Sequence, residues 1–245
     1  MRSIGSALVV VLTLSGCGGG AGGDRTVTVL AAASLTEPFE ELADRFEEDH
    51  PGVEVALAFD SSATLAQQAV GGAPADVLAT ADTRTIDTAA EVLADRPQVF
   101  ATNTLRLVTP AGNPADVEGI TDLDSPGVTW VTCVETAPCG QAARDVLAAN
   151  GIAAEPDSLE VDVKAVLARV TSDEADAGLV YASDARSAGD TVRSFDVPYA
   201  AEHATSCAIA PLEQSGEPGL ARDFIELVQS EAGQQVLAEA GFGQP

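Results

Sequence analysis

The sequence predicts an α/β fold with mainly parallel sheets. From residue 26 to about residue 240, apolar runs with the two-residue period of a strand alternate with runs that have the period of a helix. Strands that alternate with helices in this way build parallel sheets covered by helices. With 46% hydrophobic residues the chain is globular, and its 245 residues suffice for one large globule or two smaller lobes with separate cores.

The first elements are well marked. Residues 26–31 form a predicted strand, after which Ser34 is expected to cap a helix and Glu37 to complete a capping box. A second strand over 53–60 alternates apolar and polar residues, and a helix over 63–70 follows it. The stripe of the first helix repeats at helical spacing and consists of Leu35, Phe39, Leu42, Ala43 and Phe46.

The remainder of the chain continues the alternation. Further strands are predicted over 76–80, 105–110, 128–133, 177–181 and 207–212. Further helices are predicted over 140–149, over a stripe that runs from Val163 to Val170, over 219–228 and over 230–240. Asn150-Gly151 and Gly241 are the expected helix ends.

Two serines stand where a strand gives way to a helix. Ser34 follows the first strand, and Ser62 follows the second. The free N–H groups of a first helical turn and the positive end of the helix dipole can together hold an anion. Two such positions in one fold indicate a protein that binds a small oxyanion without arginine.

The N-terminus has the features of an export signal. Residues 1–16 contain Arg2 and a short apolar core, and Leu14-Ser15-Gly16-Cys17 matches a bacterial lipobox, in which Cys17 becomes the lipidated residue. A flexible Gly-rich tether completes the segment 17–23. The alternative is a plain secretory signal with an incidental cysteine.

The net charge and the cysteine content limit the possible partners and disulfides of this chain. The chain carries 12 basic and 38 acidic residues, a net charge of −26, which argues against a nucleic-acid partner. Once Cys17 is set apart, three cysteines allow at most one internal disulfide. Cys133 and Cys139 bracket a short loop and are the favoured pair, whereas Cys207 lies in an apolar run and is expected to be a buried free thiol.

Several segments stand in a recognisable order, namely Val29–Leu35, Phe59–Ala66, Gly72–Val77, Gly178–Ala185 and, near the C-terminus, Ser230–Leu237 with Gly241-Phe242. Together they resemble the molybdate-binding proteins of ABC importers, and the resemblance covers nearly all of residues 26–243. The resemblance implies a type 2 periplasmic-binding fold, in which two α/β lobes joined by two crossing strands close on a ligand. With crossings near 104–105 and 206–207, one lobe comprises 24–104 and 207–245, and the other comprises 105–206.

The resemblance also implies a set of ligand contacts. Ser34 and Ser62 match serines that offer a hydroxyl and a backbone N–H, and Tyr181 matches a tyrosine that offers its hydroxyl. Val163 and Cys139 match residues that offer a backbone N–H. A tetrahedral dianion has only acceptors, so a site made only of donors suits it.

Three aspartates near these motifs have other expected roles. Asp60 stands two positions before Ser62, where the family has a small residue, and strand alternation is expected to turn it to solvent. If it faced the ligand instead, its carboxylate could accept a proton from hydrogen phosphate. Asp76 and Asp82 are expected to hold turns and helix caps rather than a metal.

Two other classes of function compete with this interpretation. An enzyme would have to use Cys139 with His203 or His50, and no hydrolase, zinc or P-loop signature supports it. A carrier of sulfate or phosphate would keep the fold and change the ligand. We therefore expect a monomeric, membrane-anchored lipoprotein that captures molybdate or tungstate, hands it to an ABC permease, catalyses nothing and carries no cofactor or metal beyond its ligand.

Overall fold

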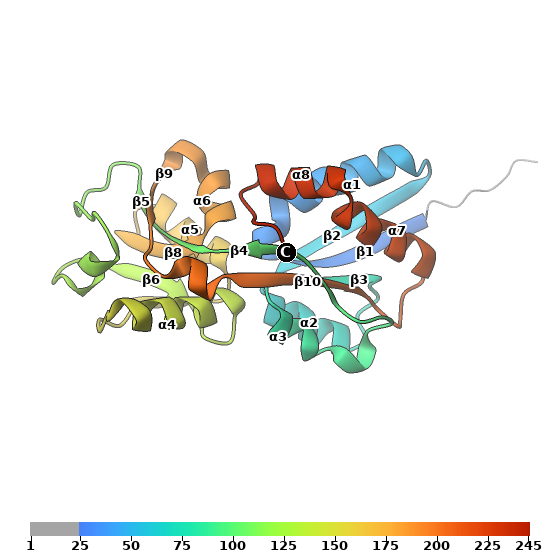
Figure 1. Ribbon diagram of the computed structural model, residues 1–245, viewed down its shortest axis with the longest axis horizontal. Coiled ribbons are helices and arrows are strands. Elements are labelled where there is room, and N and C mark those ends of the chain that lie inside the picture. Colours follow the sequence, from blue (N-terminus) through green and yellow to red (C-terminus); the bar gives the residue numbers. More distant parts are fainter. Residues whose placement is uncertain (1–24) are drawn as a thin grey trace, which may run out of the picture.

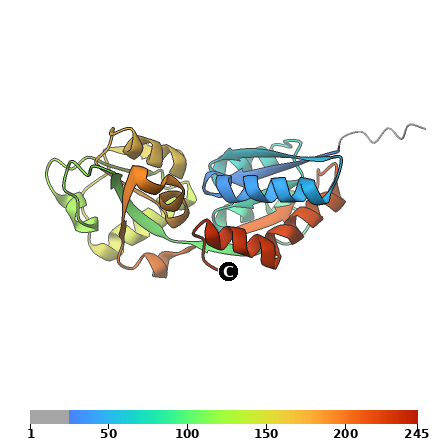
Figure 2. The same cartoon turned by 90° about the horizontal axis from the view of Figure 1, so that it is seen from above.

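The computed structural model describes residues 25–245, which form two lobes side by side (Figures 1 and 2). Each lobe contains a five-stranded sheet, in the order β2-β1-β3-β10-β4 in lobe 1 and β7-β6-β8-β5-β9 in lobe 2. The proposed signal segment, Cys17 and the tether lie outside the described residues. Within residues 25–245, no helix has both the length and the apolar character needed to cross a bilayer.

Lobe 1 combines the start and the end of the chain. Its strands are β1 (Arg25–Ala32), β2 (Val53–Asp60), β3 (Val77–Thr80), β4 (Gln98–Asn103) and β10 (Thr205–Pro211). Its helices are α1 (Thr36–Asp49), α2 (Ser62–Val70), α3 (Thr83–Asp87), α7 (Pro218–Gln229) and α8 (Glu231–Glu239). Helices α1, α7 and α8 cover one face of the sheet, and α2 and α3 cover the other (Figure 1).

Lobe 2 is built from the middle of the chain. Its strands are β5 (Leu105–Pro110), β6 (Trp130–Cys133), β7 (Ser158–Glu160), β8 (Ala177–Tyr181) and β9 (Val192–Asp196). Its helices are α4 (Pro138–Asn150), α5 (Val163–Thr171) and α6 (Ala182–Ala188). Short 3-10 turns complete both lobes, over Ala33–Leu35, Ala90–Val92, Ile120–Asp124, Gly189–Thr191 and Ala200–His203.

The sheets are mixed but mainly parallel, as predicted. In each sheet four strands run in the same direction, and one, β10 or β5, fourth in spatial order, is antiparallel to both of its neighbours. These two reversed strands belong to the segments that carry the chain from one lobe to the other. Local periodicity identifies such strands but does not give their direction.

The chain passes between the lobes twice. Strand β4 ends at Asn103 in the first sheet and β5 begins at Leu105 in the second, so Thr104 alone separates them. The return runs from β9 through the turn Ala200–His203 into β10, which begins at Thr205. At the first crossing, the Asn103 amide donates to Ser183 Oγ at 2.8 Å, and Thr104 O accepts from Ala182 N at 2.8 Å.

The structure corrects the predicted start of the first helix. Ser34 is not a cap: it lies within the 3-10 turn Ala33–Leu35, and α1 begins at Thr36 without a side-chain cap. Thr36 closes the turn by donating from Oγ1 to Ala33 O at 2.8 Å. Glu37 does not complete a capping box, because its carboxylate binds Lys164 of lobe 2 at 2.6 Å. The Ser34 hydroxyl is therefore left for another role.

Candidate functional site

A small cavity of about 20 Å³ lies between the lobes and is lined by both of them. It lies at the carboxyl ends of β1, β2 and β3 on one side and of β6, β7 and β8 on the other, which is where open α/β sheets bind ligands. Its volume is far below that of sites for organic ligands, which hold roughly 300–1,000 Å³. The lining residues are Ala32, Ala33, Ser34, Ser61, Ser62, Ala81, Ala137, Pro138, Cys139, Asp162, Val163 and Tyr181.

The structure thus brings all five predicted contact residues to one cavity. Lobe 1 supplies Ser34 and Ser62, and lobe 2 supplies Cys139, Val163 and Tyr181. Because both lobes supply lining residues, the cavity exists only when the two lobes face each other. Which of them contact a ligand stays a prediction.

Ser34 offers a hydroxyl that the protein itself does not use. The residue is 2% exposed, and its Oγ has no hydrogen-bond partner among the described residues. A buried hydroxyl without a partner costs about 1–3 kcal/mol. Such a group at the wall of a cavity is suited to a bound ligand, which would supply the missing acceptor.

The hydroxyl of Ser62 is oriented by a contact from the next strand. Ser62 Oγ accepts a hydrogen bond from Ala81 N at 3.0 Å. Because that N–H occupies a lone pair of the oxygen, the hydroxyl hydrogen is free to point elsewhere. The cap of α2 is the neighbouring Ser61, whose Oγ accepts from Thr64 N at 3.3 Å. Ser62 is the first residue of α2, so the helix provides no acceptor for its N–H.

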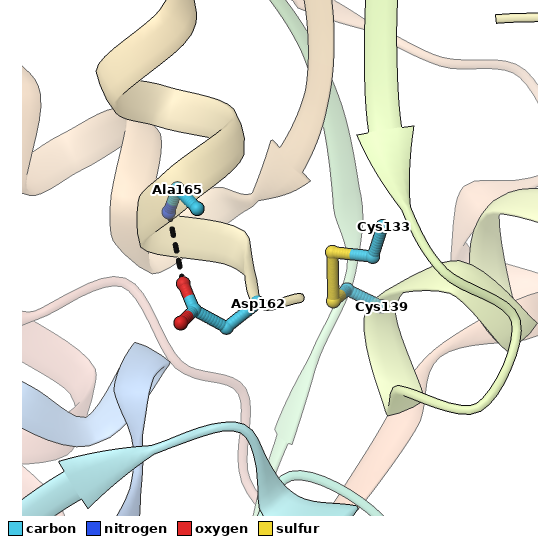
Figure 3. The surroundings of a disulfide bond; sticks show 4 residues. All are labelled: Cys133, Cys139, Asp162 and Ala165. Carbon is cyan, nitrogen blue, oxygen red and sulfur yellow. Dashed lines mark hydrogen bonds between the residues drawn. A yellow bond between two sulfur atoms is a disulfide. The ribbon is translucent and has the colours of Figure 1, made fainter. Parts of the chain in front are cut away.

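In lobe 2 the first turn of α4 forms part of the wall. Pro138 occupies its first position, where the missing N–H costs nothing, and Cys139 follows. A disulfide joins Cys139 to Cys133 at the end of β6, with 5.8 Å between the Cα atoms (Figure 3), which confirms the predicted pair. Gly140 packs so closely that a Cβ would lie 2.0 Å from Val134 O. The turn that presents Cys139 is therefore tightly constrained.

The first turn of α5 lies beside it. Asp162 is the N-cap, and its Oδ1 accepts from Ala165 N at 2.8 Å, so the carboxylate turns toward the helix and away from the disulfide (Figure 3). Val163 is 2% exposed and is the first residue of α5, so its N–H has no acceptor within the helix. Sequence reasoning missed Asp162, although an aspartate directly before an apolar helical stripe is a recognisable cap.

Tyr181 closes the cavity from the end of β8. The side chain is 2% exposed, and its Oη has no partner among the described residues. Burial raises the pKa of Tyr181 well above its ordinary value, so the phenol stays protonated and can donate. Ser34 and Tyr181 therefore place an unpaired hydroxyl on each side of the cavity.

The charge at the cavity is unusual for an anion site. Of the described residues that line it, none is a lysine, arginine or histidine, and Asp162 is the one carboxylate. Asp60 does not line the cavity, and its Oδ1 accepts from Ser61 N at 2.6 Å. Hydroxyls and helix N-termini are thus the donors that this wall can offer.

The other candidate residues have structural roles. Asp82 caps α3 by accepting from Thr85 N at 2.8 Å, and Asp76 holds the turn before α7 by accepting from Ser215 Oγ at 2.6 Å and Glu217 N at 3.2 Å, which confirms the roles expected of both. Cys207 is a buried free thiol, as predicted, and burial raises its pKa to about 12. Because Cys139 is in a disulfide, it has no free thiol to act as a nucleophile.

Residues 27–243 match the family of bacterial extracellular solute-binding proteins. The chain belongs to this family. A curated relative, the molybdate-binding protein ModA of Mycobacterium tuberculosis, is 43% identical over 225 residues, which are 91% of this chain and 86% of the relative. This extracellular solute-binding protein is therefore exported.

Solved structures confirm the fold of this solute-binding protein. The periplasmic molybdate-binding protein of Azotobacter vinelandii matches it with a TM-score of 0.78 at 20% identity, over 89% of this chain and 99% of the other. The sulfate-binding protein SubI of Mycobacterium tuberculosis matches with a TM-score of 0.77 at 19% identity, over 89% and 86%. The predicted two-lobed, type 2 periplasmic-binding fold is thereby confirmed.

Proposed function

We propose that this protein captures molybdate, and tungstate as a close substitute, in the cavity between its lobes. The observation that carries the proposal is the pair of buried hydroxyls without partners, Ser34 Oγ and Tyr181 Oη, on opposite walls of one small cavity. The 43% identity to the Mycobacterium tuberculosis molybdate-binding protein supports the choice of ion.

The chemistry of the walls suits a fully deprotonated tetrahedral dianion. Molybdate has only acceptor oxygens, and the walls offer the hydroxyls of Ser34, Ser62 and Tyr181 with the N–H groups of Cys139 and Val163. A protonated phosphate would bring a hydrogen of its own. Asp162, the one carboxylate at the wall, already accepts from Ala165 N through Oδ1. Phosphate should therefore bind less well.

The net charge of −26 does not prevent anion binding. At physiological ionic strength the Debye length is about 8 Å, so distant surface carboxylates act weakly on a buried ion. Donors within hydrogen-bond distance act unscreened. The surface charge should slow association more than it weakens the complex.

The protein would work as a carrier rather than an enzyme. In the proposed cycle it binds the oxyanion outside the cytoplasm, closes and delivers the ion to an ABC permease. It acts as a monomer, needs no resident cofactor and binds no nucleic acid. A lipid on Cys17 and the Gly-rich tether would keep it at the outer face of the cell membrane.

Thermal unfolding with four oxyanions tests this function. At a concentration of 100 times the dissociation constant, a ligand stabilises the folded protein by about 2.7 kcal/mol. We expect molybdate and tungstate to raise the melting temperature and sulfate and phosphate to leave it unchanged. A rise with sulfate or phosphate alone would identify a carrier of that ion, and no rise with any of the four would refute an oxyanion carrier.

A further inference from the structure

Outside the cavity, one ion-pair cluster joins the two lobes. Lys164, the one lysine of the sequence, follows Val163 in the first turn of α5. Its ammonium group lies 2.6 and 2.8 Å from the two carboxylate oxygens of Glu37, which belongs to α1 of lobe 1. The contact therefore links the first turn of α1, just after Ser34, to α5, whose first residue is Val163.

A second carboxylate holds the same lysine from within lobe 2. Asp184, on α6, is fully buried, and neither of its oxygens has a hydrogen-bond partner among the described residues. Lys164 Nζ lies 3.5 Å from Asp184 Oδ1 and 3.3 Å from Ser187 Oγ. The lysine side chain is only 26% exposed, so these contacts are partly shielded from water.

We propose that Lys164 sets the affinity for the oxyanion from outside the cavity, by holding the two lobes together once the ion is bound. This inference rests on the proposed function. When the lobes separate, Lys164 loses Glu37 but keeps Asp184 and Ser187 as neighbours within lobe 2. When they meet, the pair with Glu37 forms only if α1 and α5 reach the positions that also bring Ser34 and Val163 to one cavity. Opening must then break this pair, and the effect should fall on the dissociation rate of the ligand.

Substitutions at both ends of the pair, each with a matched control, test the inference. Glu37→Gln removes the contact between the lobes and leaves Lys164 beside Asp184. Glu41→Gln removes an exposed carboxylate one turn along α1, whose one ion pair within residues 25–245 is with Arg45. Lys164→Met is matched by Arg169→Met, since Arg169 is on the same helix and pairs with Glu160 and Glu174 of its own lobe. Lys164→Arg keeps the charge.

The readouts are the dissociation rate of molybdate and the radius of gyration by small-angle X-ray scattering. We expect Glu37→Gln and Lys164→Met to release molybdate about three- to fivefold faster, which is the size of effect that a half-exposed ion pair allows. We also expect a larger radius of gyration for the molybdate complex of these two variants. Lys164→Arg and both controls should behave as the wild type. Equal rates in Glu37→Gln and the wild type would overturn the inference.

The two proposals can fail separately. If the purified protein binds none of the four oxyanions, the carrier function is refuted, and scattering without ligand still compares the variants. Expansion in Glu37→Gln and Lys164→Met but not in the controls would then support the contact between the lobes. Identical radii in all of them would overturn it.

Discussion

The two walls of the cavity are built on different principles. Lobe 1 contributes side-chain hydroxyls: Ser34 Oγ, which has no partner, and Ser62 Oγ, which Ala81 N orients. Lobe 2 contributes one hydroxyl, Tyr181 Oη, and the backbone of two helix N-termini, which it constrains with the Cys133–Cys139 disulfide and the Asp162 cap. Lobe 1 should therefore respond mainly to loss of a hydroxyl, whereas lobe 2 should respond also to loss of an N–H or of the groups that position it.

The largest expected effect contrasts the buried carboxylates of the lobes. Asp76 of lobe 1 accepts hydrogen bonds from Thr28 N, Ser215 Oγ and Glu217 N. Asp184 of lobe 2 has none, and burial raises its pKa from 3.8 to about 7 despite the nearby charge of Lys164. Between these values the unfolded chain releases the proton and the folded protein keeps it. The free energy of unfolding should thus fall as pH rises from 4 to 7, by a total of about 4 kcal/mol from this group.

Two substitutions test this contrast. Asp184→Asn should remove that fall and leave the protein as stable as the wild type, or more stable, at pH 8. Asp76→Asn should destabilise it by about 1.5–3 kcal/mol, because bonds to a charged acceptor are lost. Urea unfolding from pH 4 to pH 8 measures both. An unchanged pH profile in Asp184→Asn would show that Lys164 compensates the carboxylate fully.

The next effect distinguishes the two serines of lobe 1. Ser34→Ala and Ser62→Ala should each weaken molybdate binding by about 1.5–3 kcal/mol, or roughly 10- to 150-fold. Without ligand they should differ. Ser34→Ala removes a hydroxyl that has no partner and should not destabilise the protein, whereas Ser62→Ala leaves Ala81 N unpaired and should cost about 1–3 kcal/mol. Titration calorimetry and urea unfolding measure the two quantities, and equal stabilities would contradict the proposed orientation of Ser62.

How far the sequence predicts the molecule also differs between regions. The strands at 105–110 and 177–181 are predicted with the bounds observed, because an apolar run between polar neighbours marks them. Strands β4, β7 and β9 were missed. Ser158–Glu160 and Val192–Asp196 are short and largely polar, and Gln98–Asn103 has no clear two-residue alternation. A strand of this kind forms only because a neighbouring strand pairs with it, which no local pattern records.

The candidate site, too, has a part that the sequence predicts and a part that depends on the assembled fold. All five predicted residues line the cavity. Ser34 and Ser62 follow from a local pattern, a strand end before a helix start, whereas Cys139, Val163 and Tyr181 came from the family resemblance. The role of Ser34 as a cap was wrong, since the chain tightens there into a 3-10 turn. The contacts of Ser62 with Ala81 and of Lys164 with Glu37 join residues 19 and 127 positions apart. Only the assembled fold brings such groups together.

Val163 offers a way to test the backbone wall of lobe 2 directly. Proline is tolerated at the first position of a helix, and Asp162 before it already has the extended backbone that a following proline requires. Val163→Pro should therefore keep α5 and remove one N–H, weakening molybdate binding by about 1.5–3 kcal/mol. Val163→Ala, the matched control, keeps the N–H and should bind molybdate within about twofold of the wild type. Equal affinity in both variants would remove Val163 from the site.

The smallest effect on binding should come from the disulfide of lobe 2. Replacing Cys133 and Cys139 with alanine releases a short loop and should lower the free energy of unfolding by about 2 kcal/mol, with molybdate affinity only a few-fold weaker. Urea unfolding and calorimetry measure both. Cys207→Ala is the control, since it removes the buried free thiol of lobe 1 without opening a disulfide. Unchanged affinity would mean that the close packing of Gly140 against Val134 O suffices to position Cys139. The disulfide would then stabilise lobe 2 without shaping its wall.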